Sequence, residues 1–328
     1  MIKFFKKETV FCIATVMAIV SCFFAVPSIT YIDFKTLLIL FVMMVVVQFL
    51  KAIGVFDVLV GRLVGSVSSV RGLVFVLVFA CFFGSIIITN DISLLTFVPF
   101  AIAAFKKIDK LSLIIPVVAL QTIAANMGCM VNPFGSPHDI YLFGAANLSF
   151  LSFIGILLPY WIVSLVILVV CCLLIPSSPI DKGIALAAVS VDKRDLVKKT
   201  FLGVDYFLLL TFIAFYILIG NLQHIDTVYD FFSNIVTGRE LLSSILASQI
   251  ISNVPAAMFI TGFSSSFKEI IVGVNIGGLG TLIASMANLI SYKILAHEFN
   301  SMKGKYLFVF TVSNVVLLLM LVGVYFIV

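Results

Sequence analysis

Uncharged polar side chains form four short clusters inside otherwise apolar sequence, and their types are those that bind ions without water. Two clusters place a hydroxyl before an amide, Thr89-Asn90 and Ser252-Asn253, and two lie where Gly or Pro interrupts an apolar helix. Neutral oxygens suit a dehydrated Na⁺, and the N-termini of half-helices suit an anion. The candidate binding residues are Thr89, Asn90, Asn126, Asn132, Ser136, Ser252, Asn253, Asn275, Thr281, Ser285 and Asn288.

Asp91 is the most informative single residue, because it places a carboxylate in the middle of a long apolar run. A charge at mid-membrane costs ~2.5–3.5 kcal/mol on insertion scales, so such residues usually hold a proton, an ion or a partner. We predict that Asp91 binds the coupling cation or takes up a proton; a neutral Asp that caps a helix is the alternative. Asp139 and the titratable His138 are further candidates, although both could cap the helix that resumes there. The expected Na⁺ ligands are Asn90, Asp91, Asn126, Asn253 and Asn275.

Each polar residue taken alone could equally form a hydrogen bond between two membrane helices. The four clusters together favour a binding site, since they would converge near the membrane midplane. They contain no Lys or Arg. A multivalent anion would therefore be held by hydroxyls, amides, helix ends and co-bound cations.

Catalytic patterns are absent from the sequence, so we expect a protein that is not an enzyme. Ser136 and His138 are two residues apart, which is not a catalytic geometry, and there is no nucleophile elbow, H-E-x-x-H or phosphate-binding loop. The six cysteines lie in or beside apolar runs without a C-x-x-C pair, which is typical of small hydrophobic residues. We expect no cofactor beyond Na⁺ or H⁺ as the coupling ion.

The elements that position these residues must be membrane helices. Of 328 residues, 62% are hydrophobic and 11% are charged, whereas soluble domains are about 25% charged. The apolar runs are long and continuous, as helices that span a bilayer require, and lack the alternation of a membrane β-barrel. The net charge of +5 comes from Lys and Arg in short loops, as the positive-inside rule predicts, and does not indicate a nucleic-acid partner.

The N-terminal third of the chain shows three apolar segments. Residues 9–30 follow Lys3–Lys7 and resemble a secretory signal, but without an A-x-A site, so we expect an uncleaved first helix. A second helix begins near Thr36. Residues 53–70 predict an amphipathic helix at the membrane interface, with a further span as the alternative.

Two long apolar runs have polar centres, and two helices are interrupted. Residues 72–105 are too long for one span and carry basic residues at both ends, so the chain must enter and return as a re-entrant hairpin. Residues 241–266 repeat this pattern. A helix from residue 111 is expected to break from Asn126 onward, and a later one from Asn275 onward, which frees backbone groups to bind ions.

These elements predict an all-α integral membrane protein of two inverted-topology repeats, each with a re-entrant hairpin and a broken helix, and about eight crossing helices. With the N-terminus in the cytoplasm, all but three of the 20 Lys and Arg lie on that side. The predicted regions are an N-terminal transmembrane helix (1–35), a first repeat (36–175), a cytoplasmic linker (176–203) and a second repeat (204–328). At an offset of 149, Asn126, Gly128 and Ser136 match Asn275, Gly277 and Ser285, and Asp139 falls opposite Asn288.

At these motifs the chain resembles the ion transporter superfamily. This group includes citrate transporter-like permeases, divalent anion:sodium symporters, arsenite permeases and one type of sodium/proton antiporter. Thr89-Asn90-Asp91 followed by Pro99 resembles the hairpin of arsenite permeases, and Asn132–Pro137 resembles the family's Pro-Ile-Gly-Ser/Asn-Pro segment. Ser252–Pro255 resembles the second hairpin tip and Asn275–Gly278 the second break.

In the divalent anion symporters each tip reads Ser-Asn-Thr, and the resemblance implies that these residues hold sodium and the carboxylate. Here the tips read Thr-Asn-Asp and Ser-Asn-Val, so both Thr positions differ. This departure favours proton coupling through Asp91 over dicarboxylate binding of that kind. The resemblance also implies a homodimer.

We therefore expect a secondary active transporter of the plasma (inner) membrane. It would move a small anion, a carboxylate or an inorganic oxyanion, by alternating access coupled to Na⁺ or H⁺. The alternatives within transport are sodium/proton antiport and arsenite-type efflux, and the alternative from another class is an ion channel. The expected partners are the anion and the lipid bilayer.

Overall fold

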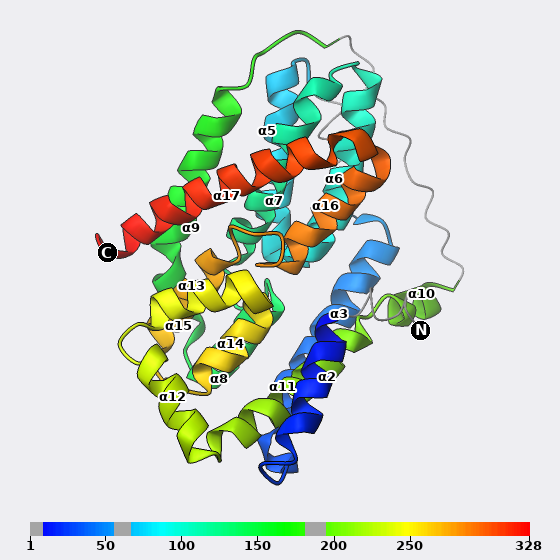
Figure 1. Ribbon diagram of the computed structural model, residues 1–328. Coiled ribbons are helices and arrows are strands. Elements are labelled where there is room, and N and C mark those ends of the chain that lie inside the picture. The colour runs from blue at the N-terminus through cyan, green and yellow to red at the C-terminus, as the bar shows by residue number, and fades with distance from the viewer. Residues whose placement is uncertain (1–8, 56–66, 181–194) are drawn as a thin grey trace.

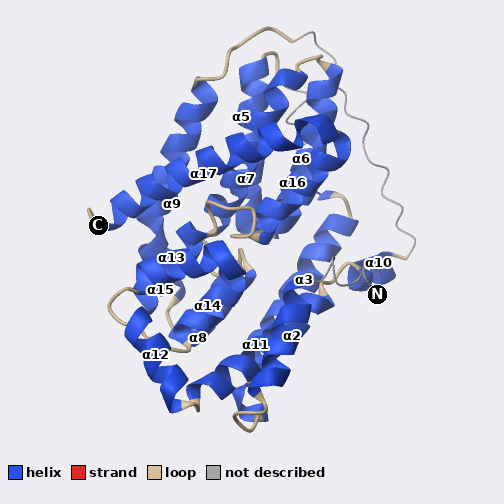
Figure 2. Ribbon diagram, in the orientation of Figure 1, coloured by secondary structure: helices blue, strands red, loops and turns tan. Residues whose placement is uncertain are grey.

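The computed structural model describes residues 9–55, 67–180 and 195–328, and within these ranges the regular elements are helices (Figures 1 and 2). The predicted all-α fold is confirmed. Six helical segments of the described chain are long and apolar enough to cross a membrane. They are Phe34–Ala52, Val70–Ile88, Leu111–Cys129, Phe150–Leu173, Leu196–Gln223 and Asn300–Tyr325.

The first helix is shorter than the expected 9–30. α2 (Thr9–Ser21) ends six residues before Pro27, and residues 22–28 form turns and irregular chain. After the single turn η1 (Ile29–Tyr31), α3 (Phe34–Ala52) begins at Asp33, whose carboxylate accepts the N–H groups of Lys35 and Thr36. The interfacial helix predicted at 53–70 lies mostly in 56–66, outside the described residues.

The next part of the chain forms two helices joined at one residue, a helix interrupted near its middle, and a long single helix. Its elements are α5 (Val70–Ile88), α6 (Asn90–Lys107), η2 (Leu111–Leu113), α7 (Ile114–Cys129), α8 (Pro137–Ala146) and α9 (Phe150–Leu173).

The second half repeats this order after three additional helices. Its elements are α10 (Leu196–Leu202), α11 (Tyr206–Gln223), α12 (Asp226–Val236), α13 (Glu240–Ile251), α14 (Asn253–Thr261), α15 (Phe267–Gly277), α16 (Met286–Glu298), η3 (Asn300–Met302) and α17 (Lys303–Tyr325). The short helix α12 lies between α11 and α13, and its Phe232 packs against Phe259 and Phe263 of the α14 region.

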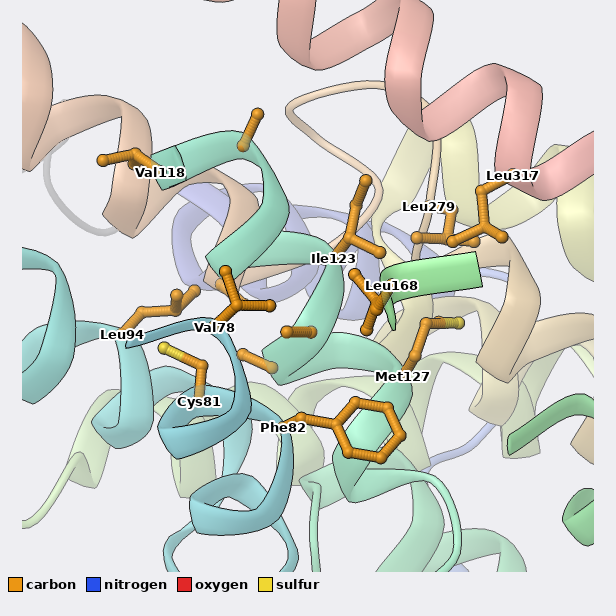
Figure 3. Packing of buried hydrophobic residues seen from close by; sticks show 14 of the residues in the cluster. Val78, Cys81, Phe82, Leu94, Val118, Ile123, Met127, Leu168, Leu279 and Leu317 are labelled. Carbon is orange, nitrogen blue, oxygen red and sulfur yellow. The ribbon is translucent and has the colours of Figure 1, made fainter. Parts of the chain in front are cut away.

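α7 forms the centre of the larger hydrophobic core. Nearly all its side chains are buried, which a helix that is apolar on every side requires. Figure 3 shows Val78 and Phe82 of α5 beside Ile123 and Met127 of α7, with Leu168 of α9 close by. The outer helices instead expose large apolar side chains over much of their surface, as lipid-facing helices do.

The helix pairs α5–α6 and α13–α14 lie in different parts of the molecule, while α16 of the second half packs beside α6 and α8 of the first half packs beside α14. Figure 1 shows α5, α6 and α7 in the upper part and α13, α14 and α15 in the lower part, with the ends of α7 and α15 near the middle. α2, α3 and α11 pack together beside them and share a second, smaller core with Ile140 of α8 and Met258 of α14.

A polar centre between the two halves

Both helix pairs turn at the predicted tips, and they do so in the same way. Thr89 joins α5 to α6 with φ 68° and ψ 152°, and Ser252 joins α13 to α14 with φ 75° and ψ 154°. A positive φ is uncommon for residues other than glycine and persists only where the surroundings hold it. In both pairs the next residue, Asn90 or Asn253, is the first of the returning helix and is buried.

The helices do not break at Asn126 and Asn275 as expected, because α7 continues to Cys129 and α15 to Gly277. The glycines near these asparagines serve close packing instead. A Cβ on Gly128 would lie 2.0 Å from the backbone oxygen of Phe82, and one on Gly277 would lie 3.0 Å from Ser248 Oγ. The irregular segments are therefore 130–136 and 278–285, one turn later than predicted.

The two half-helices that follow begin differently. Ser136 is the N-cap of α8, where its hydroxyl accepts the N–H of Asp139 over 3.3 Å. Asp139 therefore lies inside the first turn and is not the cap. Ser285 holds the equivalent position before α16, but its hydroxyl donates to Oδ1 of Asn126 over 3.1 Å.

Asn126 is the centre of the first hydrogen-bonded group. Its Oδ1 accepts the amide of Asn90 over 3.0 Å, as well as the hydroxyl of Ser285. Its own amide donates to Oδ1 of Asn288 over 2.7 Å, and Asn288 in turn donates to the backbone oxygens of Gly278 and Thr281. Residues from the first hairpin, the first interrupted helix and the second interrupted helix thus meet at one buried amide.

Asp139 is the centre of the second group. Its Oδ1 accepts the amide of Asn275 over 2.7 Å, and its Oδ2 accepts the hydroxyl of Ser136 over 2.6 Å. The His138 Nε2 atom lies 3.2 Å from Ser136 Oγ and 3.7 Å from Asp139 Oδ2. Because Asp139 is fully buried, its carboxyl depends on these donors in place of water.

The other predicted residues lie around these two groups. Asn132 donates to the backbone oxygen of Ile86 over 2.6 Å and so ties the first irregular segment to the end of α5. The backbone N–H of Asn253 donates to Ala284 over 2.9 Å, which brings the second tip beside Ser285. Among the described residues, the Ser252 hydroxyl reaches only Asn253, over 3.4 Å.

Thr89 and Asp91 are not joined to either group by a side-chain hydrogen bond that the structure records. Thr89 makes no side-chain bond at the start of α6. Asp91 is half-buried, and its Oδ1 is buried without a hydrogen-bond partner among the described residues. A buried carboxylate oxygen without a partner is costly, so it marks a position where a cation or a proton would be favoured.

Gln249 and Gln121 are functional candidates that the sequence analysis missed. Gln249 Nε2 donates to the backbone oxygens of Gly277 (2.7 Å) and Leu279 (2.9 Å), and its Oε1 accepts the N–H of Thr281 (2.9 Å). The hydroxyl of Thr281 donates to the backbone oxygen of Gln249 over 3.2 Å. An uncharged amide three residues before a hairpin tip, within an apolar run, was the available sequence signal.

Gln121 occupies a comparable place in the first half. Its Nε2 donates to the backbone oxygens of Leu77 in α5 and Phe97 in α6, both over 3.3 Å, while its Oε1 has no partner among the described residues. It therefore joins the two arms of the first hairpin to α7.

Six apolar helical segments in the described part of the chain, together with a buried polar centre, define a multi-pass membrane protein. The chain belongs to the citrate transporter family, whose model matches residues 4–266, and it is a transporter, not an enzyme. The resemblance found in the sequence motifs is thereby confirmed. The chain is 27% identical to a Methanocaldococcus jannaschii protein named as an uncharacterized transporter, over 89% of each chain. It is 26% identical to the inner membrane protein YbiR of Escherichia coli, over 80% of each chain.

Proposed function

We propose that the protein is a secondary active transporter of a small anion, a carboxylate or an inorganic oxyanion, coupled to H⁺ or Na⁺ at Asp91 and working by alternating access. The observation that carries the proposal is the reciprocal pairing at the polar centre. Asn126 of the first half binds Asn288 of the second, and Asn275 of the second half binds Asp139 of the first, both over 2.7 Å. Hydrogen bonds that join two similar halves can be exchanged when one half moves against the other.

The N-termini of four helices support anion binding at this centre. α6 begins at Asn90 and α16 follows Ser285, and both residues bind Asn126. α14 begins at Asn253, whose backbone N–H donates to the backbone oxygen of Ala284, the residue before Ser285. α8 begins at Pro137, two residues before Asp139. Helix N-termini carry partial positive charge and free N–H groups, and the described residues include no buried Lys or Arg that would supply a full charge.

The carboxylates of Asp139 and Asp91 differ in a way that favours Asp91 for the coupling role. Both oxygens of Asp139 accept hydrogen bonds from side chains. Asp91 Oδ1 has no such partner among the described residues. Na⁺ binding there would draw its other ligands from neutral oxygens, for which Asn90, Asn126, Asn253 and Asn275 are the candidates; proton binding would need no further ligand.

The proposal is tested in liposomes that contain the purified protein. Na⁺ and pH gradients are imposed separately while the uptake of labelled citrate, succinate, sulfate and arsenite is followed, with Asp91→Asn beside the wild type. Uptake of one anion that follows one gradient, and that loses this dependence in the variant, supports the proposal. Flux without dependence on either gradient and far above carrier rates would instead indicate a channel.

Sodium/proton antiport is the second candidate, and the same unpaired carboxylate oxygen favours it, because a cation antiporter needs a site that exchanges H⁺ for Na⁺ and no anion site. It predicts that a Na⁺ gradient moves protons when no anion is present.

A placement in the inner membrane agrees with the name of the Escherichia coli relative. The cytoplasmic N-terminus and the homodimer stay predictions.

A further inference from the structure

A groove separates α6 from α16 at a distance from the polar centre. It has a volume of about 480 Å³, within the usual range of ligand sites. Its walls include Pro99, Ile102 and Ala103 of α6 and Ile294 of α16. At a rise of ~1.5 Å per residue, Pro99 lies roughly 13 Å along α6 from Asn90, so the groove is not part of the ion site. Figure 1 shows α6 and α16 side by side in the upper part of the molecule.

Basic side chains surround this groove. Lys106, Lys293 and His297 line it together with one acidic residue, Glu298. Lys106 Nζ donates to Glu298 over 2.5 Å and lies 5.1 Å from the centre of the Phe299 ring. Lys293 is exposed and has no hydrogen bond or ion pair among the described residues. The groove therefore carries an excess of positive charge that its own residues do not neutralise.

We propose that this groove binds an anionic phospholipid, with the phosphate at Lys293 and the start of an acyl chain along the apolar wall. Two observations and one general property of membrane proteins fit this ligand better than a soluble anion. Pro99 and Ala103 are exposed apolar residues that an acyl chain would cover. Lys106 follows them towards the end of α6, so the charge lies where headgroups lie. Basic pockets between membrane helices are known sites for acidic headgroups.

A lipid in this groove would also act on the polar centre. α6 carries Asn90 and α16 carries Asn288, and both side chains bind Asn126. A ligand that contacts both helices favours the arrangement in which they are adjacent, and the stabilisation grows with the logarithm of the ligand's concentration over its Kd. The lipid should therefore raise the melting temperature of the wild-type protein.

The test uses native mass spectrometry and thermal unfolding of the purified full chain with phosphatidylglycerol or phosphatidylcholine of the same acyl length. Lys293→Gln removes the charge at the groove, and Ala103→Trp fills its apolar wall; both residues are exposed, so the fold should persist. Lys305→Gln, an exposed lysine at the start of α17 outside the groove, is the matched control.

Wild type and Lys305→Gln should retain phosphatidylglycerol in preference to phosphatidylcholine and be stabilised by it. Lys293→Gln should bind it about fivefold more weakly, the effect of one basic residue at an anionic surface, and Ala103→Trp should also weaken it. An equal loss of phosphatidylglycerol affinity in Lys305→Gln and Lys293→Gln would overturn the proposal, since it would indicate that the lipid binds to diffuse surface charge. Displacement of the lipid by inorganic phosphate at equal concentration would also overturn it, in favour of a soluble anion.

Discussion

Asn275 donates its side-chain amide to Asp139 over 2.7 Å across 136 residues of sequence, and Asn126 donates to Asn288 over the same distance across 162 residues. The two donors are 149 positions apart, and so are the two acceptors. Gly128 and Gly277 are also 149 positions apart, and each lies against a serine of the first helix of a pair, Ser85 of α5 and Ser248 of α13. Inverted repeats would pair equivalent residues in this reciprocal way, and they stay a prediction.

Removing the side-chain amide of Asn126 should lower the stability of the fold more than removing a side-chain amide elsewhere in the membrane. Asn126→Ala deletes the partner of Asn90, Ser285 and Asn288, and leaving buried polar groups unpaired costs ~1–3 kcal/mol each. Asn314→Ala on α17 is the control, because within the described chain the amide of Asn314 donates only to the backbone oxygen of Phe310 in its own helix. Thermal unfolding in detergent measures the difference; an equal loss in both variants would contradict a central role for Asn126.

Neutralising Asp91 and Asp139 one at a time should show which carboxyl group couples transport to the ion gradient and which one stabilises the fold. Asp91→Asn should leave the melting temperature nearly unchanged and abolish gradient-driven uptake, since the free oxygen is the predicted ion ligand. Asp139→Asn should keep coupling but lower the melting temperature. The carboxylate uses one oxygen to accept from Asn275 and the other to accept from Ser136, whereas an amide has only one oxygen. Asp226→Asn on the exposed start of α12 is the control. Coupling lost only in Asp139→Asn would move the coupling role to that residue.

The pH dependence of transport should follow the same carboxyl group if the coupling ion is H⁺. Protonation of Asp91 on the side with lower pH would load the carrier, so uptake should increase as the external pH falls and the inside is held at pH 7. In Asp91→Asn the uptake that remains should not vary with external pH. Uptake that responds to Na⁺ at constant pH would instead assign Na⁺ as the coupling ion.

Gln249 should be needed for transport as well as for stability. Gln249→Leu preserves the size of the side chain but leaves the backbone groups of Gly277, Leu279 and Thr281 without their partner. We expect transport to fall about tenfold or more, since displacing site residues by ~1 Å is enough for a large loss. Gln223→Leu, which removes a similar bond to Gly262 near the end of α11, should lower the melting temperature while transport continues.

The close packing of α7 on α5 predicts a further stability effect. Gly128→Ala would place a methyl group 2.0 Å from the Phe82 oxygen and 2.6 Å from Ser85 Oγ, both in a packed helix pair. Overpacking of this kind costs ~1–3 kcal/mol or more. Gly323→Ala on α17 meets no atom within 4 Å and should be neutral or slightly stabilising, since Ala favours helix. Equal melting temperatures for the two variants would contradict the described packing.

The hairpin tips were predictable because the reason for them is local. A polar Thr89-Asn90 or Ser252-Asn253 in an apolar run forces a turn that must be hydrogen-bonded inside the protein, and both turns lie at these residues. The helix breaks were predicted one turn too early. A glycine such as Gly128 or Gly277 can mark either a helix break or a close contact between helices, and only the position of the neighbouring helix shows which of these applies. Gln249 was missed because a single amide in an apolar run has no local consequence.

The sequence by itself determined the all-helical membrane class, the two tips, the transporter family and the residue types of the polar centre. These follow from hydropathy and short motifs, in which each residue acts on its neighbours along the chain. Only the tertiary structure decided that Asn126 meets Asn288, that Asn275 meets Asp139, and that Asp91 keeps an unpaired oxygen. Such contacts join residues far apart in the chain, so they depend on how whole helices pack and not on any local pattern.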